Sequence, residues 1–172
     1  LLSQVEDAES RFPIINISRE MTTDSEGAGR WRGQPGSLNV KKVLQPTTAM
    51  AWMVSSAHTL SGICGGDDAS SYSSHFEVGT PNEYKIELIA NALLPQDAVI
   101  AYQHGGGAGF ESALLRDPAA VRDDVLDEII SVSRAADKYG VIFSGTAEAY
   151  DLDVDVEATT ALRKSMRTAA AA

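Results

Sequence analysis

The stretch that decides the fold is Gln103-His104-Gly105-Gly106-Gly107-Ala108-Gly109-Phe110, followed closely by Arg116-Asp117-Pro118. An apolar run at residues 98–102 leads into the glycines and predicts a strand. Asp117 is a good N-cap residue, and Pro118 fits the first position of a helix. The glycines therefore join a strand to a helix, where φ must be positive or where another chain segment or a ligand comes close.

The residues before the glycines predict further strands. Alternating or β-branched runs lie at residues 14–19, 37–43 and 84–88. The continuous apolar run at 49–54 predicts a strand buried on both faces, although a short helix would show the same pattern. The glycine- and serine-rich residues 61–82 predict a long irregular loop.

After the glycines the apolar period changes to that of helices. Val121, Val125 and Ile129, with Leu126 and Ile130 beside them, predict one amphipathic helix. Further segments predicted here are a helix over 132–139 stopped by Gly140, a short strand over 141–143, and a helix over about 156–166 capped by Asp155.

We therefore predict an α+β fold, with mainly antiparallel strands over residues 10–104 followed by two or three C-terminal helices. We expect one compact unit, with a β-rich part at 1–104 and a glycine-rich turn and helical part at 105–168. Residues 169–172 are expected to form a disordered end. Because the chain starts without Met, we expect it to be a piece of something longer.

The net charge of −10 argues against nucleic acid or an anionic membrane as a partner. No apolar run approaches the roughly 20 residues that span a bilayer. The single cysteine, Cys64, allows no internal disulfide and favours the cytoplasm. We expect Cys64 to be a small buried thiol rather than a nucleophile.

The glycine run does not fit the common nucleotide-binding patterns. Gly107 and Gly109 match the first two positions of G-x-G-x-x-G, but Ser112 takes the third, and no Gly-Lys-Ser/Thr follows for a Walker loop. A structural crossing of tightly packed backbones is the favoured reading. A nest of amides at Gly106, Gly107 and Gly109 that binds an anion is the alternative.

No two of the histidines, His58, His75 and His104, have the spacing that places two metal ligands on one helix face. His104 adjoins the glycines and is the candidate catalytic residue. His75 follows Asp67 and Asp68 in the irregular loop and is the candidate metal ligand, although a surface histidine is the favoured reading.

The triplet Arg30-Trp31-Arg32 has two readings. The two arginines could clamp a phosphate or carboxylate. The favoured reading is that the triplet locks loops together through stacking and ion pairs. The acidic residues Asp123, Asp124, Asp127 and Glu128 predict a solvated helix face.

Several weak motifs in a fixed order resemble the hydantoinase B family, which includes 5-oxoprolinases and the large subunits of acetone and acetophenone carboxylases. The stretches, each with the pattern it resembles, are Glu9-Ser10-Arg11-Phe12-Pro13 (E-x-R-[YF]-P), Asp24-Ser25-Glu26-Gly27-Ala28-Gly29-Arg30-Trp31-Arg32-Gly33 (D-S-G-G-x-G-[RK]-[YWF]-R-G), Gly62-Ile63-Cys64-Gly65-Gly66 (G-L-x-G-G), Leu94-Pro95-Gln96-Asp97 (L-x-P-G-D), Gly106-Gly107-Ala108-Gly109-Phe110 (G-G-G-G-[YF]) and Lys138-Tyr139-Gly140-Val141 (D-Y-G-V). The resemblance runs from about residue 5 to residue 167.

This resemblance implies that the chain is the C-terminal portion of a B-type subunit in a hetero-oligomer. ATP and Mg would be bound by a partner of the hydantoinase A type, and any divalent metal would be bound elsewhere in the complex, so this chain would bind no cofactor and would not be active alone. Segments 55–60 and 71–76 resemble the carboxylases most, which implies carboxylation of a ketone such as acetone or acetophenone to a β-keto acid through phosphorylated intermediates. The alternatives are cyclic amide hydrolysis, as in an ATP-dependent hydantoinase or 5-oxoprolinase, and a purely structural assembly module.

Overall fold

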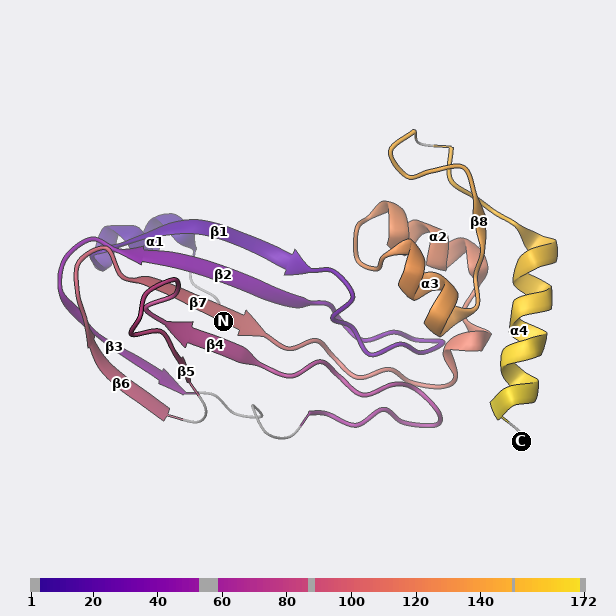
Figure 1. Ribbon diagram of the computed structural model, residues 1–172, viewed down its shortest axis with the longest axis horizontal. Coiled ribbons are helices and arrows are strands. Elements are labelled where there is room, and N and C mark those ends of the chain that lie inside the picture. Colours follow the sequence, from indigo (N-terminus) through magenta and orange to yellow (C-terminus); the bar gives the residue numbers. More distant parts are fainter. Residues whose placement is uncertain (1–3, 53–58, 87–88, 150, 171–172) are drawn as a thin grey trace. The chain divides into compact units, whose positions relative to one another are not determined.

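The computed structural model describes residues 4–52, 59–86, 89–149 and 151–170. Contacts divide the chain into two compact units of three segments each (Figure 1). The sheet unit comprises Leu1–Met21, Ser37–Thr59 and Ser71–Gly105, and the helical unit comprises Thr22–Gly36, Leu60–Ser70 and Gly106–Ala172. Residues 22–36 and 60–70, which we expected in the β-rich part, thus pack with the C-terminal helices.

The sheet unit contains a five-stranded sheet in the order β1-β2-β7-β4-β5. Neighbouring strands β2, β7, β4 and β5 pair antiparallel. The bounds are β1 Ile14–Thr22, β2 Gly36–Val43, β7 Val99–His104, β4 Ser73–Phe76 and β5 Tyr84–Ile86. The strands predicted at 14–19, 37–43 and 98–102 are confirmed. Of the strand predicted at 84–88, the described part ends at Ile86.

Two further strands, β3 (Thr47–Trp52) and β6 (Ile89–Leu94), form a separate antiparallel pair. The prediction that the apolar run is buried on both faces is wrong for β3, because Ala51 is buried whereas Met50 and Trp52 are exposed. Residues 53 and 54 of that run lie outside the described part. The core of the sheet unit is formed by Val43, Ala51, Phe76, Ile86, Leu94, Ala98 and Ile100.

Three elements of the sheet unit were not predicted. Helix α1 (Val5–Arg11) precedes β1, and its Glu9 carboxylate accepts a hydrogen bond of 2.7 Å from the backbone N–H of Asn16. This contact ties the helix to the first strand. Strand β4 lies within the predicted loop at 61–82, and β6 was not predicted because its apolar run lacks β-branched and aromatic residues apart from Ile89.

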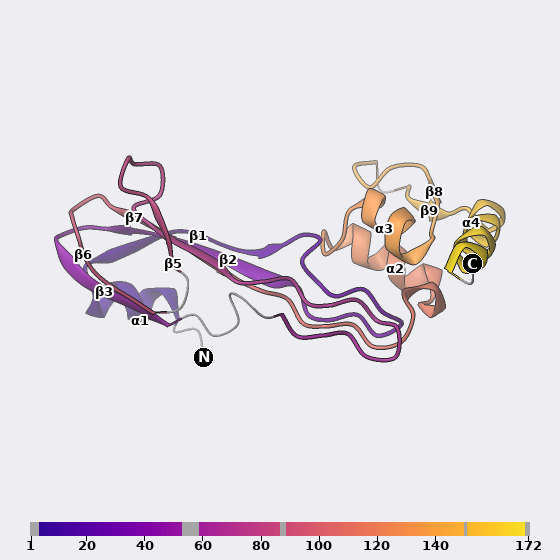
Figure 2. The same cartoon turned by 60° about the horizontal axis from the view of Figure 1, so that its bottom comes forward.

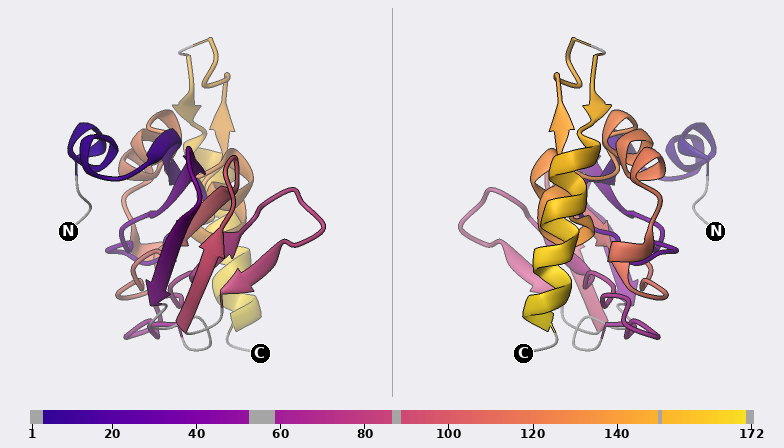
Figure 3. Two further views of the ribbon diagram at one scale, coloured as in Figure 1. Left: turned by 90° about the vertical axis from the view of Figure 1, so that its left-hand side faces the viewer. Right: turned by 90° about the vertical axis from the view of Figure 1, so that its right-hand side faces the viewer.

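The helical unit contains helices α2 (Pro118–Leu126), α3 (Val132–Tyr139) and α4 (Val156–Ala170), and the short 3-10 helix η1 (Ala113–Leu115) (Figure 3). Strands β8 (Phe143–Ser144) and β9 (Asp153–Val154) pair between α3 and α4. The caps are as predicted: Asp117 accepts from the N–H of Ala119, Asp155 accepts from that of Ala158, and Gly140 ends α3 at φ 61°. The predicted α+β class, with strands first and helices last, is confirmed.

Three predicted boundaries differ from the structure. Helix α2 ends at Leu126, so Ile129 and Ile130 lie in the turn that follows it, although Ile130 is still buried. The predicted strand at 141–143 begins only at Phe143. Helix α4 continues through Ala170 and not only to about residue 166, and residues 171–172 lie outside the described part, so the disordered end stays a prediction. A run of alanines favours continuation of a helix, which explains the longer α4.

The glycines lie where extended segments of the helical unit run side by side (Figure 2). The N–H of Gly27 donates to the Gly107 carbonyl over 2.8 Å, and the N–H of Gly107 donates to the Gln34 carbonyl over 2.8 Å. A Cβ added to Gly109 would lie 2.0 Å from the carbonyl oxygen of Ala28. Close backbone approach therefore requires glycine here, in agreement with the favoured reading of this stretch.

Candidate functional site

A pocket of about 540 Å³ in the helical unit gathers charged side chains from two loops and from α3. It is lined by Asp24, Glu26, Gly66, Asp67, Asp68, Ala69, Ser70, Arg134 and Lys138. The first loop belongs to the family-like motif at residues 24–33, the second follows the motif at residues 62–66, and α3 supplies the two cations. This pocket is the candidate binding site because charged and polar groups converge on it.

Glu26 is the most buried charged group of this pocket, with a side chain that is 0% exposed. Its Oε1 accepts hydrogen bonds from Arg134 Nε over 2.8 Å and from the Tyr139 hydroxyl over 3.0 Å. Its Oε2 is buried with no hydrogen-bond partner among the described residues. Burial lowers the pKa of Arg134, but the hydrogen bond and the charge of Glu26 outweigh this and raise it.

Tyr139 stays protonated in this environment. Burial raises the pKa of its hydroxyl, and the nearby charge of Glu26 raises it further. The phenol is therefore a fixed hydrogen-bond donor to the carboxylate and not a proton acceptor. Glu26, which lines the pocket, is thus held by Arg134 and by Tyr139.

The remaining carboxylates of the pocket are also anchored. Lys138 Nζ lies 2.7 Å from Asp67 Oδ2. Asp68 accepts from the N–H of Gly62 over 2.8 Å, and Asp24 accepts from the N–H of Ser131 over 2.7 Å. Four carboxylates face two cations that are already paired, so the pocket suits a ligand with N–H donors better than an anion.

Sequence reasoning missed this pocket. The available signal was Glu26, an acidic residue where the motif that this stretch resembles has glycine. Its partners Arg134 and Tyr139 are more than 100 residues away in sequence, so no local pattern could have found them.

The arginines of the triplet Arg30-Trp31-Arg32 are held by acidic residues of the same unit. Arg30 pairs with Glu111 over 3.1 Å, and Arg32 Nε lies 2.9 Å from Asp124 Oδ1. The Arg30 guanidinium lies over the Trp31 ring, 5.8 Å from its centroid. This arrangement supports the reading in which the triplet locks loops together.

Asp124 corrects the prediction of a solvated acidic helix face. Asp123, Asp127 and Glu128 are exposed as expected, but the Asp124 side chain is buried. Its second oxygen, Oδ2, pairs with Arg116 over 2.7 Å. The prediction is wrong for Asp124 because one carboxylate serves two arginines, of which Arg32 is far away in sequence.

The candidate anion nest has its amides engaged. The N–H of Gly106 donates to Ser70 Oγ over 2.7 Å, and the N–H of Gly109 donates to the Asp67 carbonyl over 2.9 Å. The N–H of Gly107 donates to Gln34 as described above. In this conformation the three amides serve the packing of the backbone, and an anion would have to displace these bonds.

His104 lies at the end of β7 in the sheet unit, where its ring contacts Tyr72 edge-to-face at 5.8 Å. Burial lowers the pKa of His104, and the charge of Lys41 lowers it further. Among the described residues no acidic or nucleophilic partner of His104 is recorded. Its catalytic role stays a prediction.

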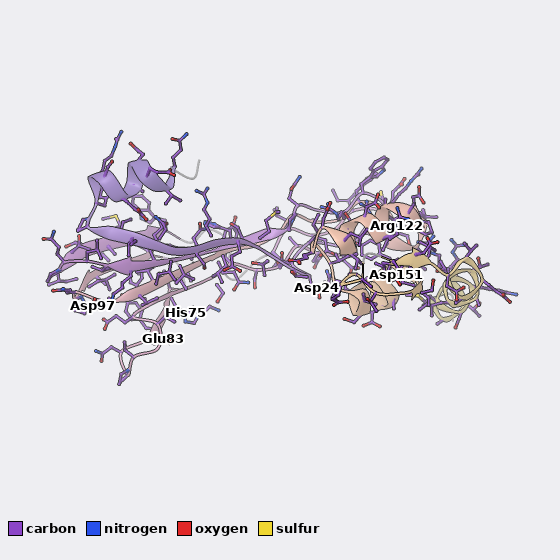
Figure 4. The ribbon with its side chains drawn as sticks, turned by 90° about the horizontal axis from the view of Figure 1, so that it is seen from above. Asp24, His75, Glu83, Asp97, Arg122 and Asp151 are labelled. Atoms are coloured by element: carbon purple, nitrogen blue, oxygen red, sulfur yellow. The ribbon has the colours of Figure 1, made fainter. Side chains whose placement is uncertain are left out.

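His75 and Glu83 lie side by side in the sheet unit, with 2.9 Å between Nδ1 and Oε1 (Figure 4). Nε2 of His75 is 3.2 Å from Ser73 Oγ, so both ring nitrogens have protein partners. Within the described ranges, no group of three or more His, Cys, Asp or Glu side chains is placed to hold a metal ion. The metal role of His75 therefore stays a prediction, and His58 lies outside the described residues.

Cys64 is exposed, so the expectation of a buried thiol is wrong. The residue sits in a turn and has a left-handed φ of 55°. No acid or base partner of its thiol is recorded among the described residues.

The first 112 residues match the family model Hydantoinase B/oxoprolinase. This range is well over half of the chain, and the chain therefore belongs to the hydantoinase B/oxoprolinase family, as its motifs predicted.

Its relatives are much longer proteins. An uncharacterized protein of Methanocaldococcus jannaschii is 27% identical over 95% of this chain. The B-type polypeptide of the "Putative D-/L-hydantoinase" of Pseudomonas sp. strain NS671 and the β-chain of the caprolactamase of Pseudomonas jessenii are each 26% identical, over 93% and 84% of the chain. The chain spans only 26–28% of the length of these relatives.

Two solved structures share the fold. The nucleotide-free acetone carboxylase superposes with a TM-score of 0.78 at 20% identity, covering 98% of this chain and 26% of the other. The ATP-dependent caprolactamase from Pseudomonas jessenii has a TM-score of 0.77 at 21% identity, covering 95% of this chain and 28% of the other.

No helix within the described residues is long and apolar enough to cross a membrane.

Proposed function

We propose that this chain works as part of a B-type subunit in a cytoplasmic, ATP-dependent hetero-oligomer that acts on a small carbonyl compound. The observation that carries the proposal is the family match over residues 1–112 in a chain that spans about a quarter of its relatives. A hydantoinase A-type partner would bind ATP and Mg, and this chain would bind neither.

Two reactions fit this proposal, and both begin by making a carbonyl oxygen a phosphate ester. In cyclic amide hydrolysis, water adds to the activated carbon, the ring C–N bond breaks as the nitrogen takes up a proton, and a second water releases the phosphate. In ketone carboxylation, water takes the phosphoryl group from the enol oxygen, carboxyphosphate releases CO2 and phosphate, and the enolate carbon forms the new C–C bond with that CO2. Such intermediates need shelter from bulk water, which an assembled multi-subunit site provides.

A specific observation favours the cyclic amide. Both relatives that are named for an activity, a hydantoinase and a caprolactamase, are named for cyclic amides. Ketone carboxylation rests on the motif resemblance and on the likeness to acetone carboxylase, which at 20% identity concerns the fold.

Within the complex, we propose that this chain serves packing and assembly rather than chemistry. Arg30, Arg32 and Asp124 are all held by partners inside the chain, and the amides of the glycine run are engaged. These contacts serve the packing of the helical unit, although the Arg30 side chain is still 50% exposed.

The test is ATP hydrolysis by the purified complex with each candidate substrate. We expect hydantoin, 5-oxoproline or caprolactam to stimulate hydrolysis without bicarbonate. Stimulation by acetone or acetophenone only when bicarbonate is present would instead identify a carboxylase. If no ATP-binding partner copurifies and none of these compounds stimulates hydrolysis, the proposal is wrong.

The assembly role is tested separately with His104→Ala and Arg30→Ala in the same complex. We expect turnover within about twofold of the wild type, provided that native mass spectrometry shows the complex to be whole. A large loss of kcat in an intact complex would assign chemistry to the substituted residue.

A further inference from the structure

Strands β3 and β6 form a hairpin-like antiparallel ribbon, although residues 53–88 separate them in sequence, and the side-chain sizes differ between the two faces of this ribbon. The face toward the core of the sheet unit carries four alanines, Ala49, Ala51, Ala90 and Ala92, and at one end the fully buried Leu94. The opposite face carries large apolar side chains: Met50 is 54% exposed, Trp52 68%, Ile89 65% and Leu93 74%.

These large side chains form one continuous surface. In the antiparallel register Trp52 lies opposite Ile89, Met50 opposite Asn91, and Thr48 opposite Leu93. Residues directly opposite each other share a face, so all six belong to one patch, which we call the hairpin face. It carries no charged side chain, although the whole chain has a net charge of −10.

This distribution is the reverse of that in a hairpin whose outer face meets water. Such a hairpin places large apolar residues toward its core and polar residues outward. Here four of the core-facing side chains are alanines and one is Leu94, while Met50, Trp52, Ile89 and Leu93 point away from the core. A continuous exposed apolar surface of this kind marks an interaction site.

We propose that the hairpin face is covered by an apolar segment of the remainder of a B-type subunit, an inference that rests on the proposed function. Nearly three quarters of the length of each relative lies outside the region that this chain spans. The family match over residues 1–112 includes the whole hairpin face, so the face belongs to the part shared with the family.

Charge argues against two other possible occupants of the hairpin face, a second copy of this chain and a partner recognised through charged groups. A second copy of this chain would bring another net charge of −10 against an uncharged patch, and the two copies would repel. A partner recognised through charged groups would leave those groups unpaired on a face that offers only Thr48 and Asn91 as polar contacts. An apolar segment fits the face without either cost.

The test places the photo-reactive residue p-benzoylphenylalanine at position 52 in the full assembly and identifies crosslinked peptides by mass spectrometry. We expect crosslinks to an apolar peptide of the B-type remainder. The same probe at Val156, which is 71% exposed on α4, is the control and is expected not to reach that peptide. Crosslinks from position 52 to this chain's own hairpin face, or none at all in an intact assembly, would overturn the inference.

A second pair of variants covers the case in which the probe prevents assembly. Asn91→Asp places one charge in the middle of the hairpin face, and we expect the yield of intact particle to fall roughly tenfold because the charge is buried without a partner. Gln96→Glu adds the same charge at an exposed turn of the same unit and should leave the yield unchanged. Equal yields for both variants would contradict the inference.

The native mass of the unmodified particle shows whether a negative result refutes the proposed function or only this inference. A particle that holds no B-type remainder refutes the proposed function and with it this inference. A particle that holds the remainder, but whose position 52 crosslinks elsewhere, refutes this inference alone.

Discussion

At the scale of single residues, Asp124 is a buried charge that joins two arginines from different parts of the helical unit. It pairs with Arg32 and Arg116 while all three side chains are less than one-fifth exposed. We expect Asp124→Asn to lower the free energy of unfolding by about 3 kcal/mol, because two partly buried cations lose their counter-ion.

Urea unfolding measures this change. The matched control is Asp123→Asn, which removes a neighbouring carboxylate that is 62% exposed and pairs with Arg122 at the surface. We expect the control to change stability by less than about 0.5 kcal/mol. If both variants lose the same amount, Asp124 does not have the role assigned to it.

His104 gives a prediction about pH. Its pKa in the folded chain lies below the ordinary value of 6.5, mainly because it is buried, so the unfolded chain takes up its proton first as pH falls. Stability is therefore expected to fall as pH drops from about 7 through 6.5 and below. Above pH 7 the residue is neutral in both states and contributes no slope.

The measurement is the free energy of unfolding of the wild type and of His104→Gln between pH 5 and 8. We expect the glutamine variant to lose part of the slope below pH 7 and to run parallel to the wild type above it. Glu9 and Glu83, whose pKa values are lowered by hydrogen bonds from Asn16 and Gly79, act below their ordinary value of 4.5 and so outside this window. Identical slopes for the two proteins would refute the burial effect on His104.

At the scale of elements, the end of α3 shows what one backbone position contributes. Gly140 has a left-handed φ of 61°, and an added Cβ would lie 2.9 Å from Arg163 Cγ. We expect Gly140→Ala to lower stability by about 1–2 kcal/mol, because both the conformation and the packing against α4 resist a side chain.

The variant Gly79→Ala separates the cost of the left-handed conformation from the cost of the contact with α4. Gly79 also has a positive φ, of 78°, but a Cβ there would meet nothing within 4 Å. Thermal or urea unfolding of both variants should show the smaller loss for Gly79→Ala, which has only the conformational cost. A loss at Gly79 as large as that at Gly140 would mean that the contact with Arg163 does not matter.

Elements with local signals could be predicted from the sequence, and those without could not. The caps Asp117, Asp155 and Gly140 are encoded within a few residues and fixed the helix ends correctly. Strand β4 has too little apolar content to stand out from its loop and is stabilised by β7, its neighbour in the sheet. The Glu26–Arg134 pair joins residues 108 apart, which no local pattern records.

At the scale of the whole molecule, the order in which the chain visits its two units has consequences for unfolding. Each unit is built from three segments that alternate along the sequence, so the chain passes from one unit to the other five times. Neither unit can therefore be formed from one continuous piece of chain, and the boundary expected near residue 104 describes only the last of these passages. If one unit unfolded, the segments of the other unit would no longer be held together at their ends.

We therefore expect the two units to unfold together, and the two tryptophans allow this to be tested. Trp52 belongs to the sheet unit, whereas Trp31 and helices α2, α3 and α4 belong to the helical unit. In Trp31→Phe, fluorescence of Trp52 follows the sheet unit while far-UV circular dichroism, to which α2–α4 contribute most, follows the helical unit. Coincident urea midpoints are the expected result, as in a two-state transition. Midpoints that differ by more than their errors would show that the alternating segments do not couple the units.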